Sequence, residues 1–239
     1  LPWETFETPM GDIVGDGAVG SINTGAVQNR YTSSYQYNLI HTAEYRKGFG
    51  DHNIDVLVGE ETRITKDWQF GAFVSGHADA RLMNITSGTN VALKDLEDAQ
   101  TKIVANSLFA TMEYNFKEKY YLYSSIRRDG SSKFAPDHRW GTFWSLGFMY
   151  NVKSTDWLKD VKWLSSAQLA VSTGTSGNSE IPNYYHLALV SGGANYDDTA
   201  GFYPSQSGNE ELGWESTWAN NFALRLGFFD RINFSFEAY

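Results

Sequence analysis

Residues 107–127 read SLFATMEYNFKEKYYLYSSIR, and this stretch decides the fold. Up to Phe116 every second residue is apolar or aromatic, and the residues between them are mostly polar. Lys117 and Glu118 interrupt this pattern, and the alternation resumes at Tyr120. Because successive side chains of a strand point to opposite faces, the stretch predicts a β-hairpin with one apolar face and one mixed polar face.

The same alternation recurs along most of the chain. It occupies residues 34–46, 53–61, 107–116, 120–127, 143–152, 163–172, 221–228 and 232–238. The interiors of the apolar faces carry no Asp, Glu, Lys or Arg. Residues 1–30 lack strong periodicity and predict a loop. Short breaks near 47–51, 117–118, 153–160 and 229–231 alternate with longer segments at 65–102, 128–140 and 174–214, which we expect to be long loops.

Two features of these segments favour a transmembrane β-barrel. The alternating stretches have roughly the 9–11 residues with which a tilted strand crosses a bilayer, and short turns alternate with long loops, as in outer-membrane barrels. Aromatic residues mark the strand ends, where amphipathic rings favour the headgroup level: Tyr35, Tyr45, Tyr114, Phe116, Tyr120, Trp144, Tyr150, Trp163 and Phe228. A soluble sandwich also keeps charge off its inner face, so a secreted carbohydrate-binding β-sandwich domain is the alternative.

Composition narrows the classes of function. Aromatic residues make up 15 % of the 239 residues, and 22 Gly against 5 Pro fit strands joined by turns. Cysteine is absent, which excludes disulfides and thiolate chemistry. A net charge of −9 argues against a nucleic-acid partner. The chain begins without Met and ends inside an alternating run, so we expect an internal piece of a longer protein.

No residues are spaced as a catalytic or metal site. The five histidines lack zinc-like spacing, Ser131 and Ser132 have no neighbouring base, and no Lys follows the glycines of 174–178. We interpret Asp-Gly-Ser-Ser at 129–132 as a turn and 174–178 as a loop. We therefore expect no enzyme and no cofactor. A loop Ca²⁺ site is a minor alternative to solvated loop acids at Asp12, Asp16, Asp197 and Asp198.

Aromatic side chains in or beside the long segments are the candidate ligand contacts. Flat rings stack on sugars, and nearby amides and carboxylates supply hydrogen bonds. The opposing interpretation, which the sequence favours, is that these rings pack the loops together. The candidates are Trp68, Trp140, Tyr184, Tyr185, Tyr196, Tyr203 and Trp214.

Three motifs carry a family resemblance. Residues 127–134 read RRDGSSKF, residues 174–178 read GTSGN, and residues 212–217 read LGWEST. In this order they resemble the SusC/RagA-type TonB-linked outer-membrane transporters, over about residues 45–239. The matching positions are Arg128, Asp129, Gly130, Ser131, Ser132, Gly174, Gly177, Asn178, Trp214 and Glu215.

The resemblance implies an all-β fold, namely about eight strands of an antiparallel transmembrane barrel of about 22 strands with long extracellular loops. Residues 1–239 would belong to one barrel domain, with the plug domain not present. The implied protein imports oligosaccharides or peptides across the outer membrane of a Gram-negative cell. Its implied partners are the TonB complex, reached through the plug, a SusD-like surface lipoprotein, and outer-membrane lipid.

Overall fold

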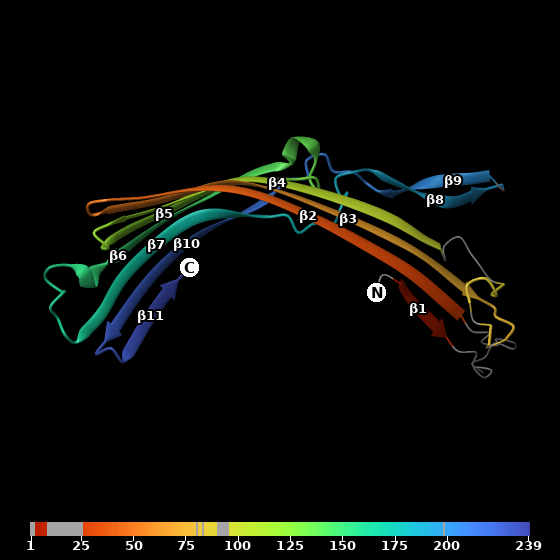
Figure 1. Ribbon diagram of the computed structural model, residues 1–239. Coiled ribbons are helices and arrows are strands. Elements are labelled where there is room, and N and C mark those ends of the chain that lie inside the picture. The colour runs from red at the N-terminus through yellow and green to blue at the C-terminus, as the bar shows by residue number, and fades with distance from the viewer. Residues whose placement is uncertain (1–2, 9–25, 80, 83, 90–95, 198) are drawn as a thin grey trace. The chain divides into compact units, whose positions relative to one another are not determined.

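The computed structural model describes residues 3–8, 26–79, 81–82, 84–89, 96–197 and 199–239, and it is almost entirely antiparallel β-structure (Figure 1). Side chains are described from residue 26 onward, except that of Tyr196. The strands are β1 Trp3–Thr8, β2 Ala26–Phe49, β3 His52–Ser75, β4 Leu96–Phe116, β5 Tyr120–Ser131, β6 Trp140–Asn151, β7 Leu164–Asn178, β8 Leu189–Tyr196, β9 Thr199–Gln206, β10 Glu215–Phe228 and β11 Ile232–Ala238. Two 3₁₀ turns, η2 Pro136–His138 and η3 Val152–Ser154, flank β6.

Hydrogen bonds join the described strands into a nine-stranded sheet in the order β1-β2-β3-β4-β5-β6-β7-β10-β11, while β8 and β9 pair separately. All eight predicted strands lie in the larger sheet, as the alternation predicted. The chain forms two compact units: residues 1–37, 64–103 and 190–203, and residues 38–63, 104–189 and 204–239. Val27, Val74 and His77 are buried in the first unit, and Phe134, Ala135, Leu164 and Ala167 in the second.

Two tight turns have the same backbone geometry, which their sequences alone do not show. Lys117 and Glu118 have φ of 55° and 52°, and Phe229 and Asp230 have φ of 55° and 54°. In each turn the third loop residue donates its N–H to the carbonyl of the last strand residue, at 3.0 Å. Two successive positive φ angles match the right-handed twist of the flanking strands, which is why these turns join hairpins.

Cross-strand register gathers the predicted apolar residues on one face of the second unit. Leu122 pairs with Phe148, Phe148 with Val171, and Val171 with Phe222, so one row crosses four strands. The neighbouring row lies on the opposite face and is small or polar: Tyr123, Gly147, Ser172 and Asn221. We call these two surfaces the apolar face and the polar face.

The apolar face of the second unit is not covered. Leu108 is 54 % exposed, Ile126 53 % and Phe148 41 %, values that a packed sandwich core excludes. The soluble sandwich alternative is therefore not supported, because its inner face would be buried. Among the described residues, no helix is long and apolar enough to cross a membrane.

The prediction of a long loop at residues 65–102 is largely wrong. Strand β3 continues to Ser75, and β4 already begins at Leu96. Residues 96–102 are therefore strand, and residues 90–95 of this segment lie outside the described part. Side-chain hydrogen bonds tie these polar strand extensions together: Ser34 donates to Asp67 at 2.6 Å, and Thr101 donates to Asp67 at 3.2 Å. Polar residues separate these extensions from the alternating runs, since residues 65–67 of β3 and most of residues 97–102 of β4 are polar, so the extensions escaped prediction.

The other predicted loops are also shorter than expected. Strand β5 runs to Ser131 and β7 to Asn178, so 129–131 and 174–178 are strand rather than turn and loop. The segment 174–214 additionally holds β8 and β9, and the predicted N-terminal loop holds β1 and the start of β2. The strands of the larger sheet have 6–24 residues, and seven of them exceed the expected crossing length.

Candidate ligand-binding site

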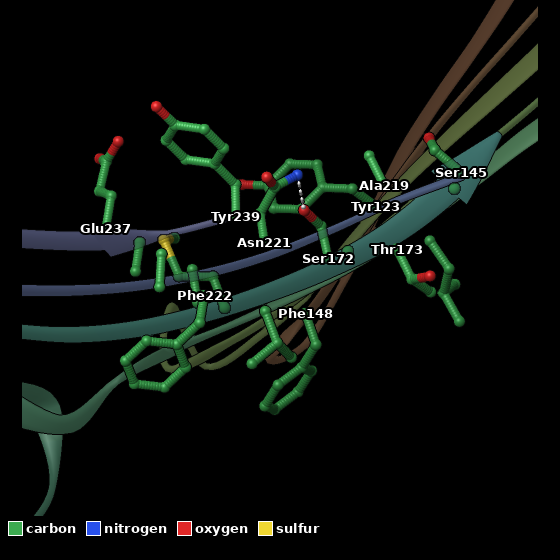
Figure 2. Close-up of a pocket in the computed structure, with 18 of the residues that line it drawn as sticks. Tyr123, Ser145, Phe148, Ser172, Thr173, Ala219, Asn221, Phe222, Glu237 and Tyr239 are labelled. Atoms are coloured by element: carbon green, nitrogen blue, oxygen red, sulfur yellow. Dashed lines mark hydrogen bonds between the residues drawn. The ribbon is translucent and has the colours of Figure 1, made fainter. Parts of the chain in front are cut away.

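The polar face of β6, β7, β10 and β11 carries an open trough of about 570 Å³. Ser145, Gly147 and Ser172 line it, together with Asn221 and Glu237. Figure 2 shows Asn221, Ser172 and Glu237 on one side of the strands and Phe148 and Phe222 on the other. Asn221 donates to Ser172 at 3.3 Å, and Arg225 pairs with Glu237 at 3.0 Å. The trough therefore offers amide, hydroxyl and charged groups over a floor of small side chains.

Arg127 organises a second polar group on this face. Its guanidinium donates to Asp129 at 2.6 Å, to Ser107 at 2.8 Å and to Glu61 at 3.1 Å. The side chains of Asp129 and Glu61 are only 17 % and 14 % exposed, so these bonds are partly shielded from water. Arg63 also binds Glu61, at 3.0 Å. A fixed, charged cluster of this kind holds neighbouring strands in register and presents directed hydrogen-bonding groups.

The polar group around Arg127 was not predicted from the sequence. Glu61 and Arg127 are 66 positions apart, and only the pairing of β3, β4 and β5 brings them together. One usable signal was present, since Asp129 follows Arg127 at a spacing of two and so shares its face. That spacing does not reveal Glu61.

Three aromatic side chains form what we call the aromatic cluster: Phe134, Phe143 and Trp214. Ring centroids of Phe134 and Trp214 are 4.8 Å apart, and those of Phe143 and Trp214 are 5.3 Å apart in an edge-to-face arrangement. The Trp214 indole N–H donates to the carbonyl of Arg139 at 2.8 Å. Phe134 is fully buried and Phe143 is 8 % exposed, so the cluster is the core beneath the loops of the second unit.

Backbone hydrogen bonds fasten three connecting segments around this cluster. Ala135 donates its N–H to Leu212 at 3.0 Å, and Asn209 donates to the carbonyl of His186 at 3.1 Å. The buried imidazole of His186 lies 3.1 Å from the carbonyl of Lys133. The segments that follow β5, β7 and β9 are therefore joined to one another rather than independent.

The motif residues have structural roles in this assembly. Gly130 lies beneath the ring of Trp140, where a Cβ would come within 2.9 Å of the indole. At Gly177 a Cβ would overlap the ring of Phe143, and at Gly174 it would lie 2.6 Å from the carbonyl of Trp144. The backbone N–H groups of Ser131 and Ser132 donate to Arg139 and Val104. Asn178 accepts from the N–H of Glu180 at 2.9 Å, and Glu215 opens β10 opposite Asn178.

Gly177→Ala is expected to destabilise the folded protein by about 1–3 kcal/mol, because the added methyl group overpacks against Phe143. Phe143 cannot move away freely, since it also contacts Trp214. Thermal unfolding of the full-length protein in detergent measures the effect. Gly192→Ala is the matched control, because a Cβ there meets nothing within 4 Å. The double variant with Phe143→Leu should recover most of the loss; equal unfolding temperatures for Gly177→Ala and Gly192→Ala would contradict this account.

The predicted ligand-contact aromatics are scattered. Trp68 lies in β3, not in a loop, and donates to Asp98 at 3.1 Å. Trp140 opens β6 on the apolar face, and Trp214 belongs to the aromatic cluster. Tyr184 has a φ of 62° and is half-buried, whereas Tyr185 and Tyr203 are each 52 % exposed. The side chain of Tyr196 lies outside the described residues. A ligand role for all seven stays a prediction, and the packing of Trp140 and Trp214 favours a structural role for these two.

Glu97 anchors the polar strand extensions of the first unit. Gln69 donates to it at 2.9 Å, and Arg30 donates through two nitrogens at 3.1 and 3.2 Å. The hydrogen bond from Gln69 and the bonds from Arg30 lower the pKa of the Glu97 carboxyl below its ordinary value.

Of the proposed calcium ligands, Asp12, Asp16 and Asp198 lie outside the described residues, so that site stays a prediction.

Comparison with known proteins finds relatives of one kind. No protein-family model matches the chain. TonB-dependent receptor P39 of Formosa agariphila is 35 % identical over 240 residues, covering 100 % of this chain and 22 % of the relative. TonB-dependent receptor SusC of Bacteroides thetaiotaomicron is 29 % identical over 227 residues, covering 88 % of this chain and 22 % of SusC. Over its whole length the chain is similar to a part of TonB-dependent receptors of the SusC/RagA type.

Solved structures of this receptor type agree with that assignment. The structure of the RagAB peptide transporter matches with a TM-score of 0.89 and 28 % identity over 98 % of this chain and 26 % of that one. RagAB in the "open-open" state matches with a TM-score of 0.84 over the same share. The chain thus spans about a quarter or less of the length of its relatives. Its fold is a segment of an antiparallel transmembrane β-barrel, as predicted, so the apolar face meets lipid and the polar face lines the interior.

Proposed function

We propose that this chain supplies consecutive wall strands and outer loops of a TonB-dependent importer in the outer membrane of a Gram-negative bacterium. The observation that carries the proposal is a sheet with an uncovered apolar face that matches the RagAB transporter over 98 % of the chain. The plug and the contact with TonB would lie in other parts of the protein. A SusD-like surface lipoprotein would be the partner at the outer surface, as the relatives' type indicates.

The cargo we propose is an oligosaccharide or a peptide. Both classes present many hydroxyl or amide groups. On the polar face, Ser, Asn and charged side chains can form hydrogen bonds with such groups, and the small residues between them leave room for the cargo. Both also expose faces on which aromatic rings stack. Since the relatives are named receptors and transporters, we propose transport without covalent chemistry, and hence no enzyme activity and no resident cofactor.

Tyr185→Ala in the full-length receptor is expected to weaken cargo binding by about tenfold, because an exposed ring that stacks on cargo contributes about 1–2 kcal/mol. Tyr185 is the best-placed candidate, because it is 52 % exposed. It lies after β7, in one of the three connecting segments that are hydrogen-bonded to one another around the aromatic cluster. The measurement is TonB-dependent uptake of a fluorescent pool of mixed oligosaccharides and, separately, of mixed peptides.

Tyr185→Phe is the matched control, because it keeps the ring and loses only the hydroxyl. Uptake that needs the receptor gene and TonB supports the transport proposal, and the pool taken up identifies the class of cargo. If neither pool enters in a receptor-dependent manner, the proposal is wrong. If Tyr185→Ala takes up cargo as the unaltered receptor does, Tyr185 has no part in binding.

A further inference from the structure

A row that includes polar side chains crosses the apolar face in the second unit. His41 on β2 is bonded to Glu60 on β3, and Leu108 on β4 is paired with Arg128 on β5. Strand alternation places Glu60 on the face of Val58, and Arg128 on the face of Ile126. The row therefore lies on the lipid-facing side, and on β5 it stands beyond Ile126, toward the connection that follows the strand.

Arg128 is the cation of this row. It is exposed, and its guanidinium carbon lies 5.4 Å from the ring centroid of Trp140, a distance at which the aromatic face attracts a cation. Within the described part of the chain no carboxylate lies within ion-pair distance of Arg128. Its neighbour Arg127 points to the opposite face and is paired with Asp129 and Glu61. Trp140 thus positions a guanidinium whose donors are directed at the surroundings.

His41 and Glu60 form the other end of the row. The His41 Nδ1 and the Glu60 carboxylate are 2.9 Å apart, and the two side chains are 63 % and 61 % exposed. A carboxylate at this level accepts hydrogen bonds from hydroxyl groups, and it repels a phosphate placed directly beside it. Arg128 is two strands away from Glu60, roughly 10 Å at the usual strand spacing. The row accordingly offers a phosphate position at one end and a hydroxyl position at the other.

A shallow groove joins the row to the apolar band. It has a volume of about 620 Å³, and Ala43, Val58, Ala110 and Ile126 line it together with His41, Glu60, Leu108 and Arg128. The side chains of Ala43 and Ala110 are small, so the wall is lower here than beside Ile126 and Leu108. A groove of this shape receives an extended acyl chain along the apolar surface.

We propose that this groove binds an acylated sugar phosphate of the outer leaflet. Arg128 donates paired hydrogen bonds to the phosphate, as a guanidinium does to a planar pair of oxygens. His41 and Glu60 bind hydroxyl groups of the sugar, and one acyl chain lies over Ala43 and Ala110. The proposal uses the apolar side of the wall, not the interior through which cargo passes, and it rests on the outer-membrane location proposed above.

The test uses the purified full-length receptor reconstituted in phosphatidylcholine nanodiscs. Binding of a monophosphorylated, acylated glucosamine disaccharide is measured by native mass spectrometry, beside the same lipid without its phosphate and beside phosphatidylglycerol. We expect Arg128→Gln to weaken binding of the phosphorylated glycolipid roughly 10- to 100-fold, because charge-assisted hydrogen bonds are lost. The dephosphorylated lipid and phosphatidylglycerol should both bind more weakly than the phosphorylated glycolipid.

Two further variants separate the parts of the site. Ala110→Trp should fill the groove and weaken binding while leaving Arg128 in place, and Glu60→Gln should weaken the glycolipid but not phosphatidylglycerol. Arg225→Gln, on the polar face, is the matched control and should bind the glycolipid normally. Equal glycolipid binding by Arg128→Gln and the unaltered receptor, or equal binding of phosphatidylglycerol, would overturn the proposal. Failure of the receptor to enter nanodiscs at all would instead overturn the membrane location.

Discussion

Val171→Arg is expected to lower the free energy of unfolding of the receptor in a bilayer by about 2–4 kcal/mol, the cost of a cation on the lipid side of a barrel near the membrane centre. Val171 is 45 % exposed on the apolar face and lies in the row of Phe148 and Phe222. A guanidinium at this position meets acyl chains instead of water, and no described carboxylate shares its row. The measurement is denaturant-induced unfolding of the full-length receptor in phospholipid vesicles.

The adjacent residue supplies the control for this experiment. Ser172 lies next to Val171 in the chain but on the polar face, beside Asn221. We expect Ser172→Arg to change the folding free energy by no more than about 0.5 kcal/mol, as is usual for a residue in contact with water. If Ser172→Arg were the more damaging of the two, the assignment of the two faces would be reversed.

Trp214→Ala is expected to cost about 3 kcal/mol of stability, because it empties the centre of the aromatic cluster. The substitution removes ring contacts with Phe134 and Phe143 and also leaves the carbonyl of Arg139 without its indole donor. Since the connecting segments are fastened around this cluster, we expect them to loosen together. Limited proteolysis of the full-length receptor in detergent should then cut within 132–139 and 178–214 before it cuts the strands of the nine-stranded sheet.

Trp157→Ala is the comparison for this loss. Trp157 is 74 % exposed in the connection between β6 and β7, so its removal should leave both the unfolding temperature and the proteolysis pattern unchanged. Trp214→Phe separates packing from hydrogen bonding, because it keeps most of the ring contacts and loses the donor. Proteolysis of Trp214→Ala that matches Trp157→Ala would show that the cluster does not hold the segments.

The success and the failures of prediction along this chain have a common cause. Strands such as 107–116 and 221–228 were found because lipid on one side and a polar interior on the other impose strict alternation. In the extension of β4 between 96 and 106, polar residues lie toward both sides, so the pattern vanishes although the strand continues. In the extension of β3, Trp68, Phe70, Ala72 and Val74 do alternate, but the polar residues 65–67 separate this short run from the run at 53–61. Residues 174–178 were mistaken for a loop because Gly, Ser and Thr usually signal turns, whereas here Gly177 makes room for Phe143.

For the candidate functional residues, too, the sequence predicted one part and only the fold showed the rest. The motifs around Arg128, Gly177 and Trp214 identified the receptor type, but their chemistry in the fold was not visible from the chain. Gly130 and Gly177 are small because aromatic rings lie against them, and Asp129 is acidic because it binds Arg127. Of the candidate ligand contacts, the structure leaves Tyr185 and Tyr203 exposed and packs Trp214 into the aromatic cluster.

The amino-acid sequence by itself determined the two-faced strands, the order of the hairpins and the receptor type, because these depend on residues that are neighbours in the chain. Only the tertiary structure decided that Glu61 meets Arg127, that three connecting segments share one aromatic cluster, and that Arg128 and Glu60 lie in one lipid-facing row. These contacts depend on cross-strand register over tens of residues. A local period fixes the face on which a side chain lies, but the pairing of the strands fixes its neighbours.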